Sequence, residues 1–201
     1  LFRSLANTAQ LTLNASFDAS NILEFRKQIK DNKDNLGLEN ITLNDIILYA
    51  VSRVLKNHRY LNAHYMEDSI YLYNNVHLGV AVDTPRGLIV PTLFNADEKS
   101  LNEISKESKI LIEESKKGSI NPDILKGATF TVTNLGSMGI ESFTPILNPP
   151  QTGILGVDTI THKVKEKDGE YIFYPAMGLS LTFDHRAVDG ALENFNILLA
   201  K

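Results

Sequence analysis

Residues 179–191 carry the sequence Leu179-Ser180-Leu181-Thr182-Phe183-Asp184-His185-Arg186-Ala187-Val188-Asp189-Gly190-Ala191. Apolar and polar residues alternate through Asp184, which predicts a strand with one buried face and one more polar face. His185 comes where that strand ends, and Gly190 allows the backbone to turn tightly into a helix over 190–199. Histidine is the side chain whose ordinary pKa suits proton transfer near neutral pH, so His185 is a candidate general base for a thiol or hydroxyl.

The residues alone leave a plainer interpretation open. Asp189 is also a good N-cap for the segment 190–199, and that role is enough to explain an Asp-Gly turn. A single histidine in a loop is more often a surface residue than a catalyst. The spacing by itself therefore favours a surface histidine at position 185 over a catalytic base by about two to one.

Three segments have apolar residues at helical spacing. Ser20 is expected to cap the first helix, which gives way to a polar loop over 31–39. Thr42 and Asp45 form a capping pattern ahead of the second helix, and the third spans 101–118 and stops at its terminal glycine. The residues of the second helix that should face the core are Leu43, Ile46, Ile47, Ala50, Val51, Val54 and Leu55.

The remaining periodic segments predict short strands. They are expected at 10–18, 63–65, 69–73, 76–83, 88–93, 128–133, 153–164, 171–174 and 176–184. A mixture of long helices and such strands predicts an α+β fold with one mixed sheet flanked by helices. At 201 residues, a single domain over 1–201 is more plausible than two.

Composition excludes several classes of function. A net charge of −4 argues against a nucleic-acid partner, and the absence of cysteine excludes thiolate catalysis and zinc–sulfur sites. No signal peptide and no bilayer-spanning apolar run is evident, so a cytoplasmic protein without a membrane partner is expected. No metal site is predicted, because the other histidines lack metal-ligand spacing. These histidines are His58, His64, His77 and His162.

Several segments resemble, in the same order, those of the dihydrolipoamide acyltransferases, which form the catalytic cores of 2-oxo acid and acetoin dehydrogenase complexes. The resemblance covers nearly the whole chain. Chloramphenicol acetyltransferases share the element with His, three residues, Asp and Gly, but the other segments favour the lipoamide family. The segments that carry the resemblance are 41–45, 61–63, 80–88, Phe130-Thr131-Val132-Thr133-Asn134-Leu135-Gly136, Asn148-Pro149-Pro150-Gln151, 153–157 and 179–191.

The resemblance implies a fold like that of chloramphenicol acetyltransferase, assembled as a homotrimer with its active site in a channel between neighbouring subunits. Trimers of relatives often build larger cages, and that step is left open for this chain. The lipoyl domain and the peripheral-subunit-binding domain are absent from residues 1–201. The implied partners are a lipoyl domain, a decarboxylase and a dihydrolipoamide dehydrogenase.

The implied reaction passes an acyl group between dihydrolipoamide and coenzyme A. His185 would be the general base, and the hydroxyl of Thr133 would stabilise the tetrahedral oxyanion, with Ser137 as the second candidate for that role. Without the resemblance, Thr133 reads as an ordinary β-branched strand residue. Asp189 is counted with the catalytic residues; support of the catalytic loop is its expected role and proton transfer is the alternative. Asp184 and Arg186 are expected to support the loop. The side chains that bind the coenzyme A nucleotide cannot be located.

The sequence leaves the acyl group and the class of protein partly open. Residues 7–12 are similar to those of acetoin- and pyruvate-type members, which favours acetyl. One alternative is a stand-alone coenzyme A-dependent O-acetyltransferase. Another is a non-catalytic scaffold core, against which the presence of His185, Asp189 and Thr133 together argues.

Overall fold

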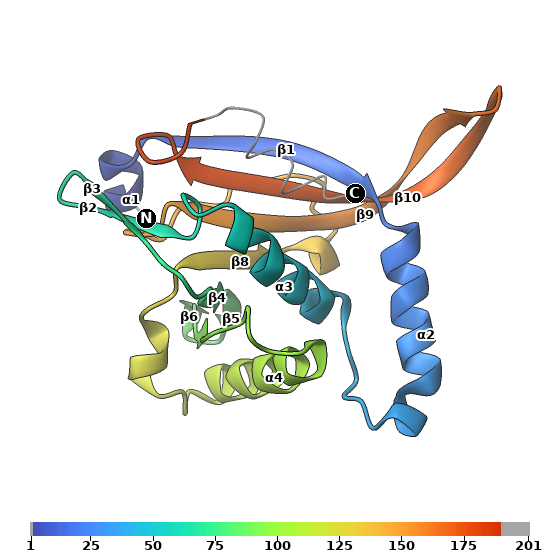
Figure 1. Ribbon diagram of the computed structural model, residues 1–201, viewed down its shortest axis with the longest axis horizontal. Coiled ribbons are helices and arrows are strands. Elements are labelled where there is room, and N and C mark those ends of the chain that lie inside the picture. Colours follow the sequence, from blue (N-terminus) through green and yellow to red (C-terminus); the bar gives the residue numbers. More distant parts are fainter. Residues whose placement is uncertain (1, 190–201) are drawn as a thin grey trace.

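The computed structural model describes residues 2–189, and its centre is a mixed sheet of six strands in the order β1-β10-β9-β8-β4-β7 (Figure 1). Strand β8 runs parallel to its neighbours β4 and β9, whereas the other neighbouring pairs are antiparallel. The predicted α+β fold with a mixed sheet is therefore confirmed. The strands are β1 (Gln10–Asp18), β4 (Leu78–Val80), β7 (Thr92–Leu93), β8 (Phe130–Asn134), β9 (Gly153–Lys167) and β10 (Glu170–Asp184).

Two small hairpins and several helices complete the described part of the chain. No helix within residues 2–189 is long and apolar enough to cross a membrane. The hairpins are β2 (Ala63–Met66) with β3 (Ser69–Leu72) and β5 (Val82–Thr84) with β6 (Gly87–Ile89). The helices are α1 (Phe2–Asn7), α2 (Ser20–Leu36), α3 (Leu43–Val54) and α4 (Leu101–Lys117), with single 3₁₀ turns η1 (Leu55–Asn57), η2 (Pro122–Leu125) and η3 (Gly136–Met138).

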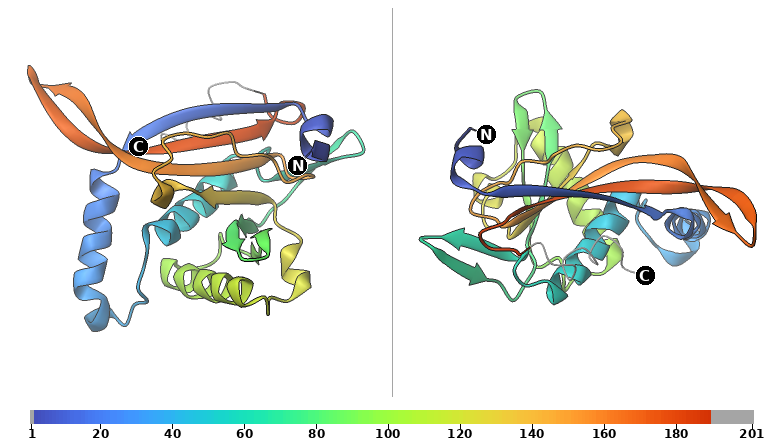
Figure 2. Two further views of the ribbon diagram at one scale, coloured as in Figure 1. Left: turned by 180° about the vertical axis from the view of Figure 1, so that it is seen from behind. Right: turned by 90° about the horizontal axis from the view of Figure 1, so that it is seen from above.

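The structure divides some predicted strands and joins others. The expected strand 76–83 is two short strands, β4 and β5, and 88–93 is likewise divided between β6 and β7. The expected strands 171–174 and 176–184 are one continuous strand, β10. Together with β9 it forms a long two-stranded ribbon that projects beyond β1 (Figures 1 and 2). Val164, Tyr171 and Phe173 are exposed on this ribbon.

Helix α2 is longer than predicted and begins differently. Ala19 occupies the N-cap position, whereas Ser20 is the first helical residue and its hydroxyl donates to Asp18. The helix continues to Leu36, through most of the predicted loop 31–39, because exposed polar residues do not end a helix. Gly37 ends it, with φ of 62° in the left-handed region that glycine enters without strain.

Helix α3 has the predicted capping box. Asp45 accepts the backbone N–H of Thr42 at 2.8 Å, and the Thr42 hydroxyl accepts that of Asp45 at 3.2 Å. The Asp45 carboxylate is buried and also accepts the hydroxyls of Ser105 and Ser108 from α4, each at 2.9 Å. Most of the predicted stripe is buried, but Ala50 is exposed. One carboxylate therefore both starts α3 and joins it to α4.

The two faces of the sheet differ in chemistry. One face carries the apolar side chains of alternating strand residues, which pack with α3 and α4 in the main core. The other face is polar, and the structure buries it as well. Thr12 and Thr182 share a hydrogen bond of 2.7 Å there, and Ser180 donates to Asn14 at 2.7 Å. Residues 140–151 and α1 cover this polar face.

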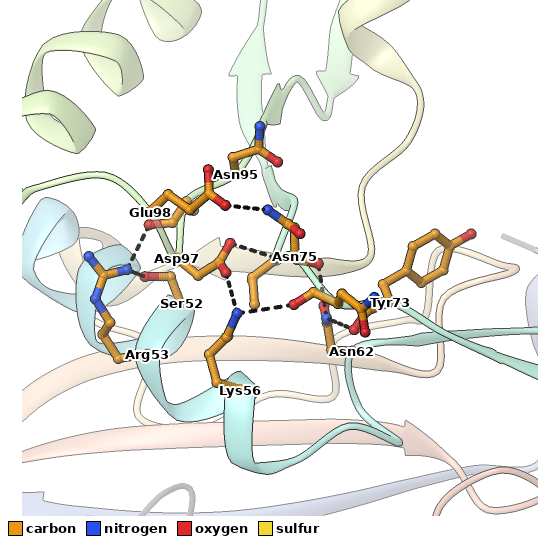
Figure 3. Close-up of polar contacts among 12 residues, drawn as sticks. Ser52, Arg53, Lys56, Asn62, Tyr73, Asn75, Asn95, Asp97 and Glu98 are labelled. Atoms are coloured by element: carbon orange, nitrogen blue, oxygen red, sulfur yellow. Dashed lines mark hydrogen bonds and ion pairs between the residues drawn. The ribbon is translucent and has the colours of Figure 1, made fainter.

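A polar cluster ties the end of α3 to the chain that enters β4 (Figure 3). Lys56 forms an ion pair of 2.7 Å with Asp97, whose other oxygen accepts the backbone N–H of Val76 at 2.8 Å. Asn75 donates to Glu98 at 2.8 Å in the same cluster. The cluster thus joins η1, the segment that precedes β4 and the loop that follows β7.

We expect Asp45→Ala to lower the free energy of unfolding by about 2 kcal/mol, because the variant loses an N-cap partner and leaves buried serine hydroxyls without an acceptor. Chemical denaturation measures this loss. Glu103→Ala is the matched control, since Glu103 forms the same capping box with Ser100 at an exposed position. Equal losses in the two variants would contradict a bridging role for Asp45.

Candidate active site

Thr133 lies near the end of β8, on the polar face of the sheet. It is paired with Gly156 of β9, where a Cβ atom would come within 2.7 Å of the Phe143 ring. Thr133 and Phe143 line a cleft of about 940 Å³. Among residues 2–189 the Thr133 hydroxyl makes no hydrogen bond, whereas Thr131 and Thr182 on the same face are both bonded. Thr133 therefore presents a hydroxyl that is available to a ligand.

Ser137, the second candidate for the oxyanion donor, lies elsewhere. It is exposed in η3 and lines a different cavity of about 780 Å³, together with Asn134. Successive residues of a strand point to opposite faces, which explains why Asn134 lines a different cavity from Thr133. The structure thus separates the two candidate hydroxyls and leaves only Thr133 in the first cleft.

His185 is the first residue after β10. Its backbone N–H donates to Ala9 at 2.8 Å, and its exposed ring lies with its centroid 5.9 Å from that of Phe183. The cleft that contains Thr133 is lined by Asp184 and Arg186, but His185 is not among its lining residues. Within one chain, then, the two proposed catalytic groups do not share a cleft.

Asp184 and Arg186 brace the backbone around His185. The buried Asp184 carboxylate accepts hydrogen bonds from Nε of Arg186 at 2.9 Å and from Nη2 at 2.5 Å. Burial tends to raise the pKa of Asp184, but the hydrogen bonds from Arg186 outweigh it and hold the pKa below its ordinary value. The guanidinium also stacks on Tyr65, 4.3 Å from the ring centroid. These contacts therefore restrain the backbone of the loop that carries the His185 imidazole.

Asp189 is exposed at the end of the described chain. The helix predicted over 190–199 lies outside the described residues, and so does the expected N-cap interaction of Asp189 with it. Its supporting role stays a prediction.

The sequence does not mark out two buried polar residues, Gln151, which lines the cleft, and Asp158, which lines the cavity that contains Ser137. Gln151 accepts the hydroxyl of Thr131 at 2.6 Å and so joins the loop 148–151 to β8. Asp158 is buried beside Ser180, whose hydroxyl lies 3.0 Å from Oδ2. Burial raises the pKa of Asp158, only partly opposed by that hydrogen bond. The sequence does hold one signal for Asp158, since it is a charged residue within the mostly apolar run 153–160.

Comparison with known proteins decides the family. The model of the family described as 2-oxoacid dehydrogenases acyltransferase (catalytic domain) matches residues 1–195. The chain belongs to this family. The resemblance seen in the sequence is thereby confirmed.

Curated relatives of the acyltransferase domain include two proteins of Bacillus subtilis (strain 168). The dihydrolipoyllysine-residue acetyltransferase component of the acetoin cleaving system is 37% identical over 188 residues, which are 94% of this chain and 47% of that protein. The corresponding component of the pyruvate dehydrogenase complex is 38% identical over 183 residues, 90% of this chain and 41% of that protein. The chain thus spans less than half the length of these relatives.

Solved structures share the fold. The cubic core of a pyruvate dehydrogenase multienzyme complex matches with a TM-score of 0.91 at 32% identity, covering 98% of this chain and 83% of that one. A chloramphenicol acetyltransferase matches with a TM-score of 0.63 at 12% identity, covering 96% of this chain and 86% of that one, which shows the fold alone. The predicted similarity to the chloramphenicol acetyltransferase fold is confirmed.

Two of the other histidines in the acyltransferase domain, His64 and His77, make structural contacts, whereas His162 is exposed on β9. His64 is buried, with Nε2 2.8 Å from the carbonyl of Ala128 and Nδ1 2.9 Å from the Tyr73 hydroxyl, and burial lowers its pKa. His77 lies just before β4 rather than within a strand, and its Nδ1 accepts the backbone N–H of Asn95 at 3.0 Å. In the part of the chain that the structure describes, no three potential metal ligands gather.

Replacing Arg186 should lower the free energy of unfolding of the acyltransferase domain by an amount that depends on pH. Breaking a buried ion pair costs about 3–5 kcal/mol, and since the Arg186 side chain is 38% exposed we expect about 2 kcal/mol for Arg186→Met at pH 7. The lowered pKa of Asp184 contributes stability above its unfolded pKa, and this is lost as the pH falls through the folded value. The difference between wild type and variant should therefore shrink below about pH 4.

Denaturation at several pH values measures this difference. Lys165→Met is the matched control, because it breaks a 2.6 Å ion pair with Asp18 that is open to solvent on both sides. A stability difference for Arg186→Met that is independent of pH, or no larger than that of the control, would show that Arg186 does not stabilise the Asp184 carboxylate.

Proposed function

We propose that this chain is the acyltransferase core that moves an acetyl group between dihydrolipoamide and coenzyme A. The family, the names of the two Bacillus relatives and the retained His185 motif support this proposal. The single observation that carries the chemistry is the Thr133 hydroxyl, which lines the cleft without a hydrogen bond among the described residues. A hydroxyl free to donate is what a developing oxyanion requires.

The proposed reaction needs a base and an oxyanion donor. A thiol is mostly protonated at neutral pH, and its thiolate is the nucleophile. His185 takes the proton from the coenzyme A thiol as the sulfur attacks the thioester carbonyl of the acetyl-lipoyl group. Thr133 donates a hydrogen bond to the oxyanion that forms. When the intermediate collapses, the carbon–sulfur bond to the lipoyl group breaks and His185 returns the proton to that sulfur.

The proposed active site is shared between subunits. His185 is exposed and lies outside the cleft of Thr133, so each chain supplies a base to one neighbour and a hydroxyl to another. A homotrimer with cyclic symmetry closes this arrangement into three equivalent sites. The match to a cubic core supports assembly of the trimers into a cage.

The acyl group and the partners follow from the relatives. Both Bacillus relatives are named acetyltransferases, which favours acetyl over larger acyl groups. We infer that a lipoyl domain on a separate part of the protein delivers the acetyl group. A decarboxylase loads the lipoyl group, a dihydrolipoamide dehydrogenase reoxidises it, and the complex works in the cytoplasm.

Thr133→Ala should lower kcat for acetyl transfer from acetyl-dihydrolipoamide to coenzyme A by about 10²–10³-fold, the usual effect of losing one oxyanion donor. Ser137→Ala is the control, since that hydroxyl lines the other cavity, and its kcat should stay within twofold of wild type. A steady-state assay with both substrates measures these values. A larger loss for Ser137→Ala would exchange the roles of the two residues.

His185→Ala should abolish acetyl transfer, and mixing subunits tests where the base acts. When His185→Ala and Thr133→Ala trimers are dissociated and reassembled at equal amounts, about a quarter of the interfaces combine an intact base with an intact hydroxyl. The mixture should therefore recover about a quarter of the wild-type activity. If recovery fails although mixed trimers are present, the two groups do not act across a subunit boundary.

A further inference from the structure

The residue after Thr133 is held by two hydrogen bonds. Oδ1 of Asn134 accepts the backbone N–H of Gly136 at 2.9 Å, which fixes the orientation of its amide. Its Nδ2 then donates to Oδ1 of Asn44 at 3.1 Å. We call this pair of side chains the Asn44–Asn134 latch. It joins the end of β8 to the first turn of α3.

The α3 end of the latch is rigid. Asn44 lies between the residues of the capping box, Thr42 and Asp45, and the buried Asp45 carboxylate is held in turn by Ser105 and Ser108 of α4. The backbone that carries Asn44 is therefore held by the first turn of α3 and, through Asp45, by α4. A contact to such a support restrains position more than a contact between two mobile surface side chains does.

The backbone that follows Asn134 is also restrained. The Leu135 N–H donates to Val157 at 3.0 Å, and a Cβ atom on Gly136 would lie 2.8 Å from the Asp158 carbonyl, so the turn is pressed against β9. Strand β8 ends at Asn134. The latch therefore adds a side-chain contact to α3 at the last residue of the strand, one residue from Thr133.

We propose that Asn44 and Asn134 are positioning residues that hold the Thr133 hydroxyl at the place where the oxyanion develops. This inference rests on the proposed role of Thr133. An oxyanion donor must be placed to within a few tenths of an ångström, and misplacement by about 1 Å is enough to cost about 10²-fold in rate. Neither asparagine touches the substrate in this proposal.

The test compares three variants of the full-length protein in the acetyl-transfer assay. Asn44→Leu keeps the approximate volume but removes the acceptor, and its kcat should fall about tenfold while KM for coenzyme A stays within twofold. Asn44→Asp keeps an acceptor oxygen and places an acid favourably near the helix N-terminus, so it should retain at least about half of the wild-type kcat. Asn75→Leu is the matched control and should leave kcat unchanged.

The control removes a bond of the same kind. Asn75 is half-buried like Asn44 and donates to Glu98 at 2.8 Å (Figure 3), but this side-chain hydrogen bond does not reach β8. Equal losses of kcat in Asn44→Leu and Asn75→Leu would overturn the proposal, since they would indicate general destabilisation. A loss in Asn44→Asp as large as that in Asn44→Leu would also overturn it.

A double-mutant cycle with Thr133→Ala separates the latch from the catalytic residue. If Asn44 acts through the Thr133 hydroxyl, Asn44→Leu should lower kcat by less than about twofold once that hydroxyl is absent. If Thr133→Ala lowers kcat strongly, but Asn44→Leu lowers kcat by the same factor with and without the Thr133 hydroxyl, the positioning role of the latch is overturned and the proposed function stands. If Thr133→Ala alone has normal activity, the role of Thr133 and the positioning role both fail.

Discussion

Buried polar groups must be hydrogen-bonded, and this constraint shapes the sheet of this protein. Over residues 179–184 both faces of β10 are buried, although only one is apolar. The polar face carries threonine, serine, asparagine and aspartate side chains. Residues 140–151 can cover this face only because these side chains form hydrogen bonds there. Such a network favours one arrangement of the side chains, since each hydroxyl can be satisfied by only a few positions of its neighbours. Thr133 stands out against it because its hydroxyl is left unbonded within the described chain.

The topology explains why a hydroxyl can be placed this way. Strand β8 runs parallel between β4 and β9, so its carboxyl end lies at one edge of a well-supported sheet. The absence of a side chain at Gly156 admits the ring of Phe143 beside Thr133. At the end of β10, the same sheet carries His185 on a loop braced by Asp184 and Arg186. One sheet thus carries Thr133 and His185 at the ends of different strands, and under the proposed function the two groups meet when a second copy of the chain supplies one of them.

The sequence is a good guide where a local rule decides the outcome and a poor one where tertiary packing does. The capping box of Thr42 and Asp45 and the glycine that ends α4 are local, and both were predicted correctly. The boundaries of α2 and the division of 76–83 depend on what packs against those segments. Alternation along β10 revealed its polar face but not the cover that buries it. Thr133 was named from the family resemblance alone. His185 was a candidate base from its place at the strand end, but only the resemblance made that interpretation the favoured one. The partners of Asn44, Asn134 and Asp158 include residues distant in sequence, which the sequence alone does not reveal.

The choice of threonine at position 133 has a consequence of its own. A β-branched side chain on a strand has few accessible rotamers, because two heavy atoms on Cβ crowd the backbone. Its oxygen is therefore aimed before a ligand arrives, and little side-chain entropy is lost when the hydrogen bond forms. A serine would carry the same oxygen with greater torsional freedom. The methyl group that makes Thr133 look like an ordinary strand residue is thus what gives its hydroxyl a direction.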